Sequence, residues 1–323
     1  TQNFNERTVL SSFRVGFSFV GSLFAAAGIP LLVDVIFANQ SEARSYLYMG
    51  VIFGIIMAIL LITTGAISKE RVKGARTNYE NFLETIISFF KLREFRRVSG
   101  LYLFNAIGSG IIMALSIFFL SDVLKVGDDA AVFMAIPLVT AICFAPFWTI
   151  VSHRAGKTKA YIFGGLLTLI VLATVFIVPA EHIPIIAVFL FFVGIALSAL
   201  QIIPMSLLPD VIDIDEYKNN IRREGAFNGL IMFLHKASSG LAVGGVGLII
   251  EWFGYQEAIP GQTVDIVQPN SALTAIRVVL ALGPAISFII AMLFARNLDV
   301  SERRFSTIMD ELKIRQEKRR TDM

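Results

Sequence analysis

The chain has 323 residues, of which 55% are hydrophobic and only 16% are charged, and its mean hydropathy is +0.71. Soluble domains are usually about 45–50% apolar and about one quarter charged, so this composition excludes an ordinary soluble protein. A single cysteine, Cys143, excludes a disulfide framework, and with a net charge of only +3 we expect no nucleic-acid partner.

Eight apolar segments follow one another along the chain, each long enough to cross about 30 Å of hydrocarbon at about 1.5 Å per residue. They lie at roughly residues 9–33, 45–67, 99–121, 131–151, 159–180, 183–209, 226–253 and 273–295. The sequence therefore predicts an all-α integral membrane protein, a bundle of about eight transmembrane helices.

Basic and acidic residues separate into alternate loops between these spans. One set of loops holds most of the basic residues, including Arg7, Arg154, Lys157, Lys159, Lys218, Arg222, Arg223 and Arg296. The opposite loops are mainly acidic, with Asp34, Asp122, Glu181 and Glu251 among their residues. Because cytoplasmic loops are enriched in Lys and Arg, we expect a multi-pass protein of the plasma membrane (a bacterial inner membrane) with both ends of this chain in the cytoplasm.

Two stretches are amphipathic and too short or too polar to span. In the linker 69–98, Phe82, Ile86, Phe89 and Phe90 recur at helical spacing and precede a basic run. The tail 297–323 repeats this pattern with Phe305, Ile308, Met309 and Leu312. We interpret both as basic cytoplasmic helices lying in the membrane interface. A solvated surface helix remains the alternative for each.

The linker divides the spans into two and six. The chain opens in what looks like a loop, without an initiator methionine or a signal peptide. Four further spans upstream would give two six-helix halves, the architecture of major facilitator transporters. We therefore expect residues 1–68 to be the last two helices of an N-terminal half and residues 99–296 to be a complete C-terminal half.

Carboxylates gather where the sixth span ends, at Asp210, Asp213, Asp215 and Glu216. Several share one helical face, and the helix dipole disfavours negative charge at a C-terminus. They need cationic neighbours, and Arg222, Arg223 and, from the first span, Arg14 are candidates. We interpret this set as an ionic latch between helix ends, with a solvated acidic loop as the alternative. Arg14 lies about two turns into its span. Two interpretations are equally open for it: a functional role, or a long side chain that snorkels to the cytoplasmic interface.

Lys236 lies about 18 Å along the seventh span, too deep to reach the interface. A lysine at that depth costs roughly 2.5–3.5 kcal/mol, so it should face a wet cavity or a buried partner. We assign it to solute or ion handling, against the alternative of a lysine held by backbone carbonyls. The neighbouring His235 is interpreted as a hydrogen-bonded packing residue.

Soluble catalytic motifs are missing from the sequence. We find no P-loop, GxGxxG, HExxH or Gly-x-Ser-x-Gly motif. The three histidines, at 153, 182 and 235, have no metal-ligand spacing. We therefore expect no enzyme, no resident cofactor and no metal site.

The residues around these charges resemble the glycoside–pentoside–hexuronide:cation symporters, the melibiose permease-like branch of the major facilitator superfamily. The run Asn5–Leu10 with Arg14 is similar to the loop before that family's helix V. The run Pro204–Asp213, continuing through Glu216 to Gly225, resembles its helix X–XI junction, and Lys236 falls on its helix XI lysine. Residues His153–Lys157 are similar to the superfamily's short cytoplasmic loop motif, with His153 where Asp is more usual. The resemblance spans essentially the whole chain and implies helices V–XII of a twelve-helix fold.

The resemblance implies an alternating-access secondary transporter in which Na⁺ or H⁺ drives the uptake of a sugar or glycoside. It places Arg14, Gln201 and Lys236 at the substrate cavity. It places Asp210, Asp213, Glu216, Arg222, Arg223 and Glu224 in a cytoplasmic charge network. The family's main cation-binding carboxylates lie on helices II and IV, outside this chain. Gln201 stands where melibiose permease has a sugar-stacking aromatic residue, which weakens a galactoside assignment.

Two alternatives to sugar symport stay open. The same family includes sodium-dependent lysophospholipid transporters, and the runs Lys236–Gly240 and Phe253–Gln256 resemble that branch too. A non-transporting membrane scaffold or receptor is the third reading. The partners expected are a small solute, a coupling cation and the lipid bilayer.

Overall fold

The computed structural model describes residues 4–68, 82–126, 130–219, 223–256, 267–298, 307–308 and 311, and these residues form helices with no strand among them. The elements are α1 (Phe4–Pro30), η1 (Leu31–Ile36), α2 (Glu42–Ile67), α3 (Phe82–Lys91), α4 (Arg93–Phe118), η2 (Phe119–Val123), α5 (Ala130–Ala155), α6 (Lys157–Thr174), α7 (Ile183–Asn219), α8 (Glu224–Trp252) and α9 (Asn270–Arg296). The labels η1 and η2 mark π-helical turns that prolong α1 and α4.

Eight of these helices are long and apolar enough to cross a membrane, which confirms the predicted number of spans. The largest change in bounds is at the sixth span, where α7 continues to Asn219 through Pro204 and Pro209. Membrane helices tolerate such prolines because neighbouring groups satisfy the freed backbone. The carboxylates from Asp210 to Glu216 therefore stand on a continuous helix.

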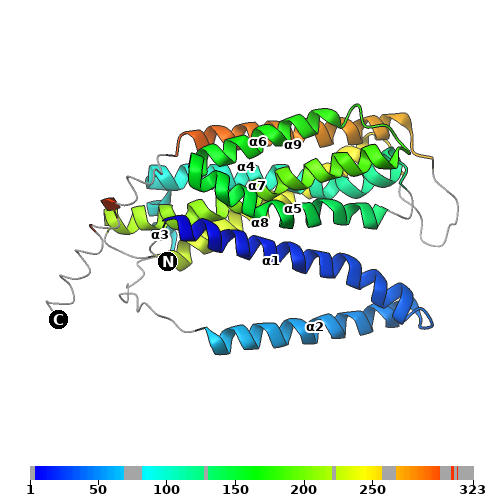
Figure 1. Ribbon diagram of the computed structural model, residues 1–323, viewed down its shortest axis with the longest axis horizontal. Coiled ribbons are helices and arrows are strands. Elements are labelled where there is room, and N and C mark those ends of the chain that lie inside the picture. Colours follow the sequence, from blue (N-terminus) through cyan, green and yellow to red (C-terminus); the bar gives the residue numbers. More distant parts are fainter. Residues whose placement is uncertain are drawn as a thin grey trace.

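The helices run side by side, with α2 lying apart below α1 in the view of Figure 1. Helix α4 packs against α8 and α9, α7 packs against α5 and α6, and α1 packs against α5 and α7. Helix α2 makes its main contacts with η1. The bundle is thus built around α4, α5, α6, α7, α8 and α9, with α1 laid against one side.

Small residues set how closely the central helices approach. A Cβ on Gly194 of α7 would come within 2.5 Å of the Pro137 carbonyl oxygen on α5, and one on Gly164 of α6 would overlap the Ala199 side chain. Close helix contact through small residues is typical of membrane bundles, because packing rather than hydrophobic burial holds the helices together.

The predicted linker helix is present as α3, but part of its apolar face packs against other helices of the protein. Phe89 is 1% exposed and packs against Phe95 of α4 and Phe227 of α8, with ring centroids 5.5 Å and 4.0 Å away. Ile308 of the tail is buried as well. Part of both predicted interfacial faces is therefore used for contacts within the protein. Residues 69–81 and the tail's Phe305, Met309 and Leu312 lie outside the described residues.

Candidate functional site

Two groups of polar side chains among the described residues are candidate sites, and the first is at the C-terminal end of α7. Asp210 accepts a hydrogen bond from Lys157 at 2.6 Å between Nζ and Oδ2, and the two side chains are 0% and 1% exposed. Lys157 Nζ also donates to the Ser206 carbonyl oxygen at 2.9 Å. The pair joins the start of α6 to the last turns of α7 in a water-free setting, where an ion pair persists only if it is well hydrogen-bonded.

The turn before α6 positions this lysine. Gly156 has a φ of +89° and precedes Lys157, the first residue of α6. Side chains with a Cβ disfavour that backbone conformation, so a glycine here lets the chain reverse between α5 and α6 within one residue. The short loop motif His153–Lys157 therefore places the Lys157 side chain against Asp210 of α7.

A second ion pair holds the loop between α7 and α8. The Arg223 guanidinium donates to both oxygens of Asp215, at 2.8 Å to Oδ1 and 3.0 Å to Oδ2, and to the Ser88 hydroxyl of α3 at 2.7 Å. It also lies over the Phe89 ring, 4.6 Å from the centroid. A two-pronged carboxylate contact and a cation–π contact make this a well-defined geometry.

A third pair connects α7 to α4, with Lys218 Nζ 3.0 Å from Glu94 Oε2. We call the three pairs, Lys157–Asp210, Arg223–Asp215 and Lys218–Glu94, the helix-end ion cluster. It links α3, α4, α6, α7 and the start of α8 at the end of the bundle where α1 begins.

The cluster shows which cations meet the carboxylates at the end of α7. Arg222, Arg223 and Arg14 were the candidates to neutralise the carboxylates from Asp210 to Glu216; the structure pairs Arg223 with Asp215, and it adds Lys157, which was not among the candidates, as a partner of Asp210. Arg222 lies outside the described residues. Asp213 is buried, Glu216 is half-buried, and Glu224 is exposed in the first turn of α8, where the helix dipole favours an acid.

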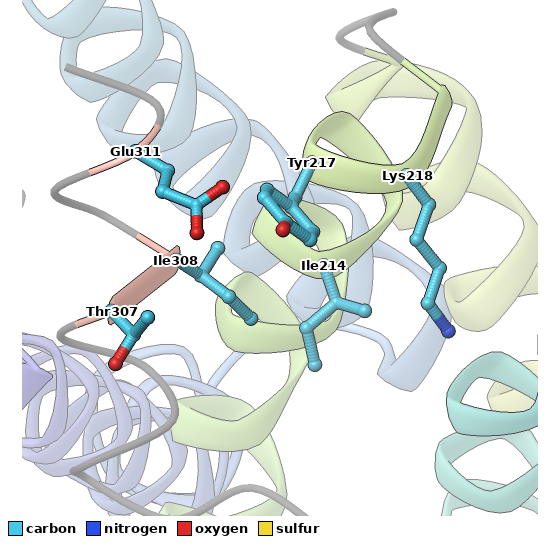
Figure 2. A pocket seen from close by; sticks show the side chains of 6 residues that line it. All are labelled: Ile214, Tyr217, Lys218, Thr307, Ile308 and Glu311. Carbon is cyan, nitrogen blue, oxygen red and sulfur yellow. The ribbon is translucent and has the colours of Figure 1, made fainter. Parts of the chain in front are cut away.

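Beside the cluster, a small cavity of about 250 Å³ separates the end of α7 from the tail (Figure 2). Its lining includes Ile214 and Tyr217 from α7 and Ile308 and Glu311 from the tail, and Glu311 points towards the Tyr217 ring. Ile308 is 6% exposed. The contact seats this part of the tail on α7.

The second group, which we call the central polar group, comprises Arg14 of α1, Tyr102 of α4, and His235 and Lys236 of α8. The Tyr102 and His235 rings meet edge to face at 6.4 Å between centroids. Arg14 interacts electrostatically with Tyr102. At about 1.5 Å per residue, these side chains lie on the order of 13–18 Å from the starts of their helices, all from the same end of the bundle.

Two polar atoms of the central polar group make no hydrogen bond to the described residues. Within the described part of the chain, the buried Tyr102 hydroxyl and the buried His235 Nδ1 atom have no hydrogen-bond partner. This corrects the interpretation of His235 as a hydrogen-bonded packing residue. The Arg14 and Lys236 side chains are exposed. Buried polar atoms are normally satisfied, so unsatisfied ones beside exposed cations indicate a place where water or a ligand binds.

Gln201 is half-buried on α7, in the segment where Ile202 and Met205 pack near Val15 and Phe19 of α1. No hydrogen bond joins Gln201 to Arg14 or Lys236 among the described residues. Arg14 lies within electrostatic range of Tyr102, and the Tyr102 ring meets that of His235 on α8, the residue before Lys236. The place of Gln201 at the substrate cavity stays a prediction. Sequence reasoning missed Tyr102, although a tyrosine in the apolar run Leu101–Leu103 was a signal.

Comparison with known proteins gives a family model that matches residues 1–302 and is described as MFS/sugar transport protein. The chain is 27% identical over 229 residues, 71% of its length, to an uncharacterised symporter of Synechocystis sp.. It is 24% identical over 52% of its length to sodium-dependent lysophosphatidylcholine symporter 1-B of Danio rerio. It is 23% identical over 84% of its length to an isoprimeverose transporter of Lactiplantibacillus pentosus. These matches span 42%, 31% and 57% of the relatives' own lengths, respectively.

Proposed function

The chain belongs to the MFS/sugar transport protein family, a family of multi-pass membrane transporters rather than enzymes, and we propose that it serves cation-coupled symport of a sugar or glycoside by alternating access. The observation that carries the proposal is the central polar group. Two cations, Arg14 and Lys236, stand exposed at mid-depth on helices that cross a membrane.

Hydrocarbon is an unsuitable environment for these two side chains. Each intramembrane cation costs roughly 2.5–3.5 kcal/mol on insertion scales, and such residues almost always face a bundle interior or a water-filled cavity. The face of α8 that carries Lys236 is therefore the wall of a solute path. Tyr102 and His235 supply hydrogen-bonding atoms to the same place, which suits a solute rich in hydroxyl groups.

The helix-end ion cluster supports the alternating-access part of the proposal. Alternating access needs helix ends that separate and rejoin, and ion pairs between different helices are contacts that can break and reform. Applying the positive-inside rule to the loops, this end of the bundle is cytoplasmic. We assign Asp213, Glu216, Arg222 and Glu224 to the same network, and residues 1–68 and 99–296 to two halves that move against each other across the linker.

The test is uptake into vesicles containing the purified protein under an imposed Na⁺ or H⁺ gradient, with a panel of labelled sugars and glycosides. We expect gradient-driven uptake of at least one of them, and we expect Lys236→Leu to reduce it while membrane insertion stays intact. The matched control is Lys125→Leu, an exposed lysine near Glu181 that lies outside both groups. Uptake that is indifferent to both gradients, or to Lys236→Leu, would contradict the proposal.

A lysophospholipid is the second candidate solute, favoured by the match to the Danio rerio symporter and by the two cations, which suit an anionic phosphate. Adding a lysophospholipid to the same panel separates the candidates, since the true substrate competes with its own labelled form. A protein that moves neither class of solute would instead be a scaffold or receptor.

A further inference from the structure

A basic pocket of about 510 Å³ lies between α3, the start of α4 and the end of α7. Its lining includes the cations Lys91, Arg93, Lys218 and Arg223, together with the polar side chains of Ser88 and Asn219. The volume falls within the range of small-molecule sites. Neither the central polar group nor the solute path uses this pocket.

Among the described residues, the cations that line the pocket outnumber the carboxylates paired with them. Lys218 is paired with Glu94 and Arg223 with Asp215, but Lys91 and Arg93 have no carboxylate partner among the described residues. Two cations therefore remain to attract an anion. The paired Arg223 is fixed by Ser88 and the Phe89 ring, so this wall of the pocket is preorganised.

Helix geometry adds to the positive potential. Helix α4 begins at Arg93, and its N-cap residue, Leu92, has a side chain that cannot accept a hydrogen bond from the first-turn N–H groups. Both residues line the pocket. The first turn of a helix of 26 residues thus contributes its partial positive charge beside Lys91 and Arg93. At the end of α3, Arg96 donates to the Phe90 carbonyl oxygen at 2.8 Å and so satisfies one of the last carbonyl groups of that helix.

Apolar side chains next to the pocket indicate where the anion comes from. On α3, Ile87 is 57% exposed and Phe90 is 40% exposed, directly before Lys91. Exposed apolar residues beside basic ones, at the ends of membrane-spanning helices, are typical of protein surfaces that sit at lipid headgroups. Helix α3 lies at the end of the bundle, level with the start of α1 (Figure 1).

From the pocket, its unbalanced cations and its apolar margin, we propose that it binds the phosphate of an anionic phospholipid headgroup. The lipid phosphate lies against Lys91, Arg93 and the first turn of α4, and the acyl chains follow Ile87 and Phe90. The bound lipid ties the linker helix to the ends of α4 and α7. This goes beyond the proposed transport function and does not depend on it, because lipid binding is measured without any solute.

The experiment measures retention of phosphatidylglycerol against phosphatidylcholine on the purified protein by native mass spectrometry over a lipid titration. The test variant is Lys91→Gln/Arg93→Gln, whose residues take part in no ion pair within the described chain. The matched control is Arg154→Gln/Lys159→Gln, which removes the same two charges at the same end of the bundle, from exposed positions outside the pocket. A further arm adds inorganic phosphate as a competitor.

The protein should prefer phosphatidylglycerol, and the test variant should bind it roughly 25-fold more weakly, since two basic residues near an anionic lipid surface each contribute about fivefold. The control should keep the original affinity, and inorganic phosphate should not displace the lipid. Unchanged binding by the test variant, or an equal loss in the control, would overturn the proposal. Displacement by inorganic phosphate would show a soluble-anion site and would overturn the lipid assignment.

Discussion

The buried pair Lys157–Asp210 permits a sharp prediction about stability. Replacing Lys157 by Met removes the ammonium group that lies 2.6 Å from the Asp210 carboxylate, and Asp210→Leu removes that carboxylate from the ammonium group, which also donates to the Ser206 carbonyl oxygen. With both side chains at most 1% exposed, water cannot compensate for the loss. Breaking one side of a buried ion pair costs about 3–5 kcal/mol, whereas replacing both partners by apolar residues is often neutral or stabilising.

We therefore expect each single variant to lose about 3–5 kcal/mol of unfolding free energy and the double variant Lys157→Met/Asp210→Leu to recover most of it. The assay is denaturant titration in mixed micelles, followed by the fluorescence of the buried Trp148, whose Nε1 donates to the Ile195 carbonyl oxygen at 2.8 Å. A Trp252→Phe background removes the second, 87% exposed tryptophan.

Arg154→Met is the control for this cycle, because it removes an exposed cation from the same loop and should change the stability by less than about 0.5 kcal/mol. If the double variant is as unstable as the two single variants added together, the two charges are not energetically coupled. That outcome would refute the account of the pair as a structural unit.

Three further predictions follow from individual side chains. Gly156→Ala should lose about 1–2 kcal/mol in the same titration, from backbone strain alone, because its φ is +89° and no atom lies within 4 Å of the added Cβ. An unchanged denaturation midpoint would mean that the backbone of the turn adopts another conformation without a loss of stability. Tyr102→Phe should leave stability intact, since the hydroxyl has no partner in the described chain, but should weaken solute binding on the order of tenfold. Equal affinities would remove Tyr102 from the binding site. Arg223→Lys should lose about 1–2 kcal/mol, because a lysine makes neither the two-pronged contact with Asp215 nor the same stacking on Phe89. An unchanged free energy of unfolding in that variant would show that a positive charge at position 223 is enough to hold Asp215.

The number of spans was predictable because hydrocarbon thickness fixes how long an apolar run must be. The end of α7 was not, since apolar character stops near Pro209 while helical hydrogen bonding continues to Asn219. Hydropathy records the environment of side chains, whereas helix length also depends on contacts that stabilise polar turns. At α7 those contacts come from Lys157, Arg223 and Glu94.

Charged residues in apolar or helix-end positions indicated the candidate sites, but the sequence spacing did not predict which charged residues pair with each other. Lys157 and Asp210 are separated by 53 residues, and only the packing of α6 on α7 brings them together. Arg223 was expected among the acids of α7, yet its choice of Asp215 depends on where α3 places Ser88 and Phe89. Tyr102 became a candidate because its ring meets the His235 ring edge to face where α4 packs against α8. Such long-range pairings are set by helix packing, not by local periodicity.

The central claim is that the Lys236 face of α8 lines an aqueous solute path, and cysteine accessibility tests it most directly. In a Cys143→Ser background, Lys236→Cys is compared with Leu241→Cys, which is 78% exposed but about 140° further round the helix. We predict that a membrane-impermeant thiol reagent modifies the cysteine at 236, that transported solute slows this reaction, and that the cysteine at 241 stays unmodified in lipid. Protection of both positions from the reagent, or a reaction at 236 that no solute affects, would contradict the account.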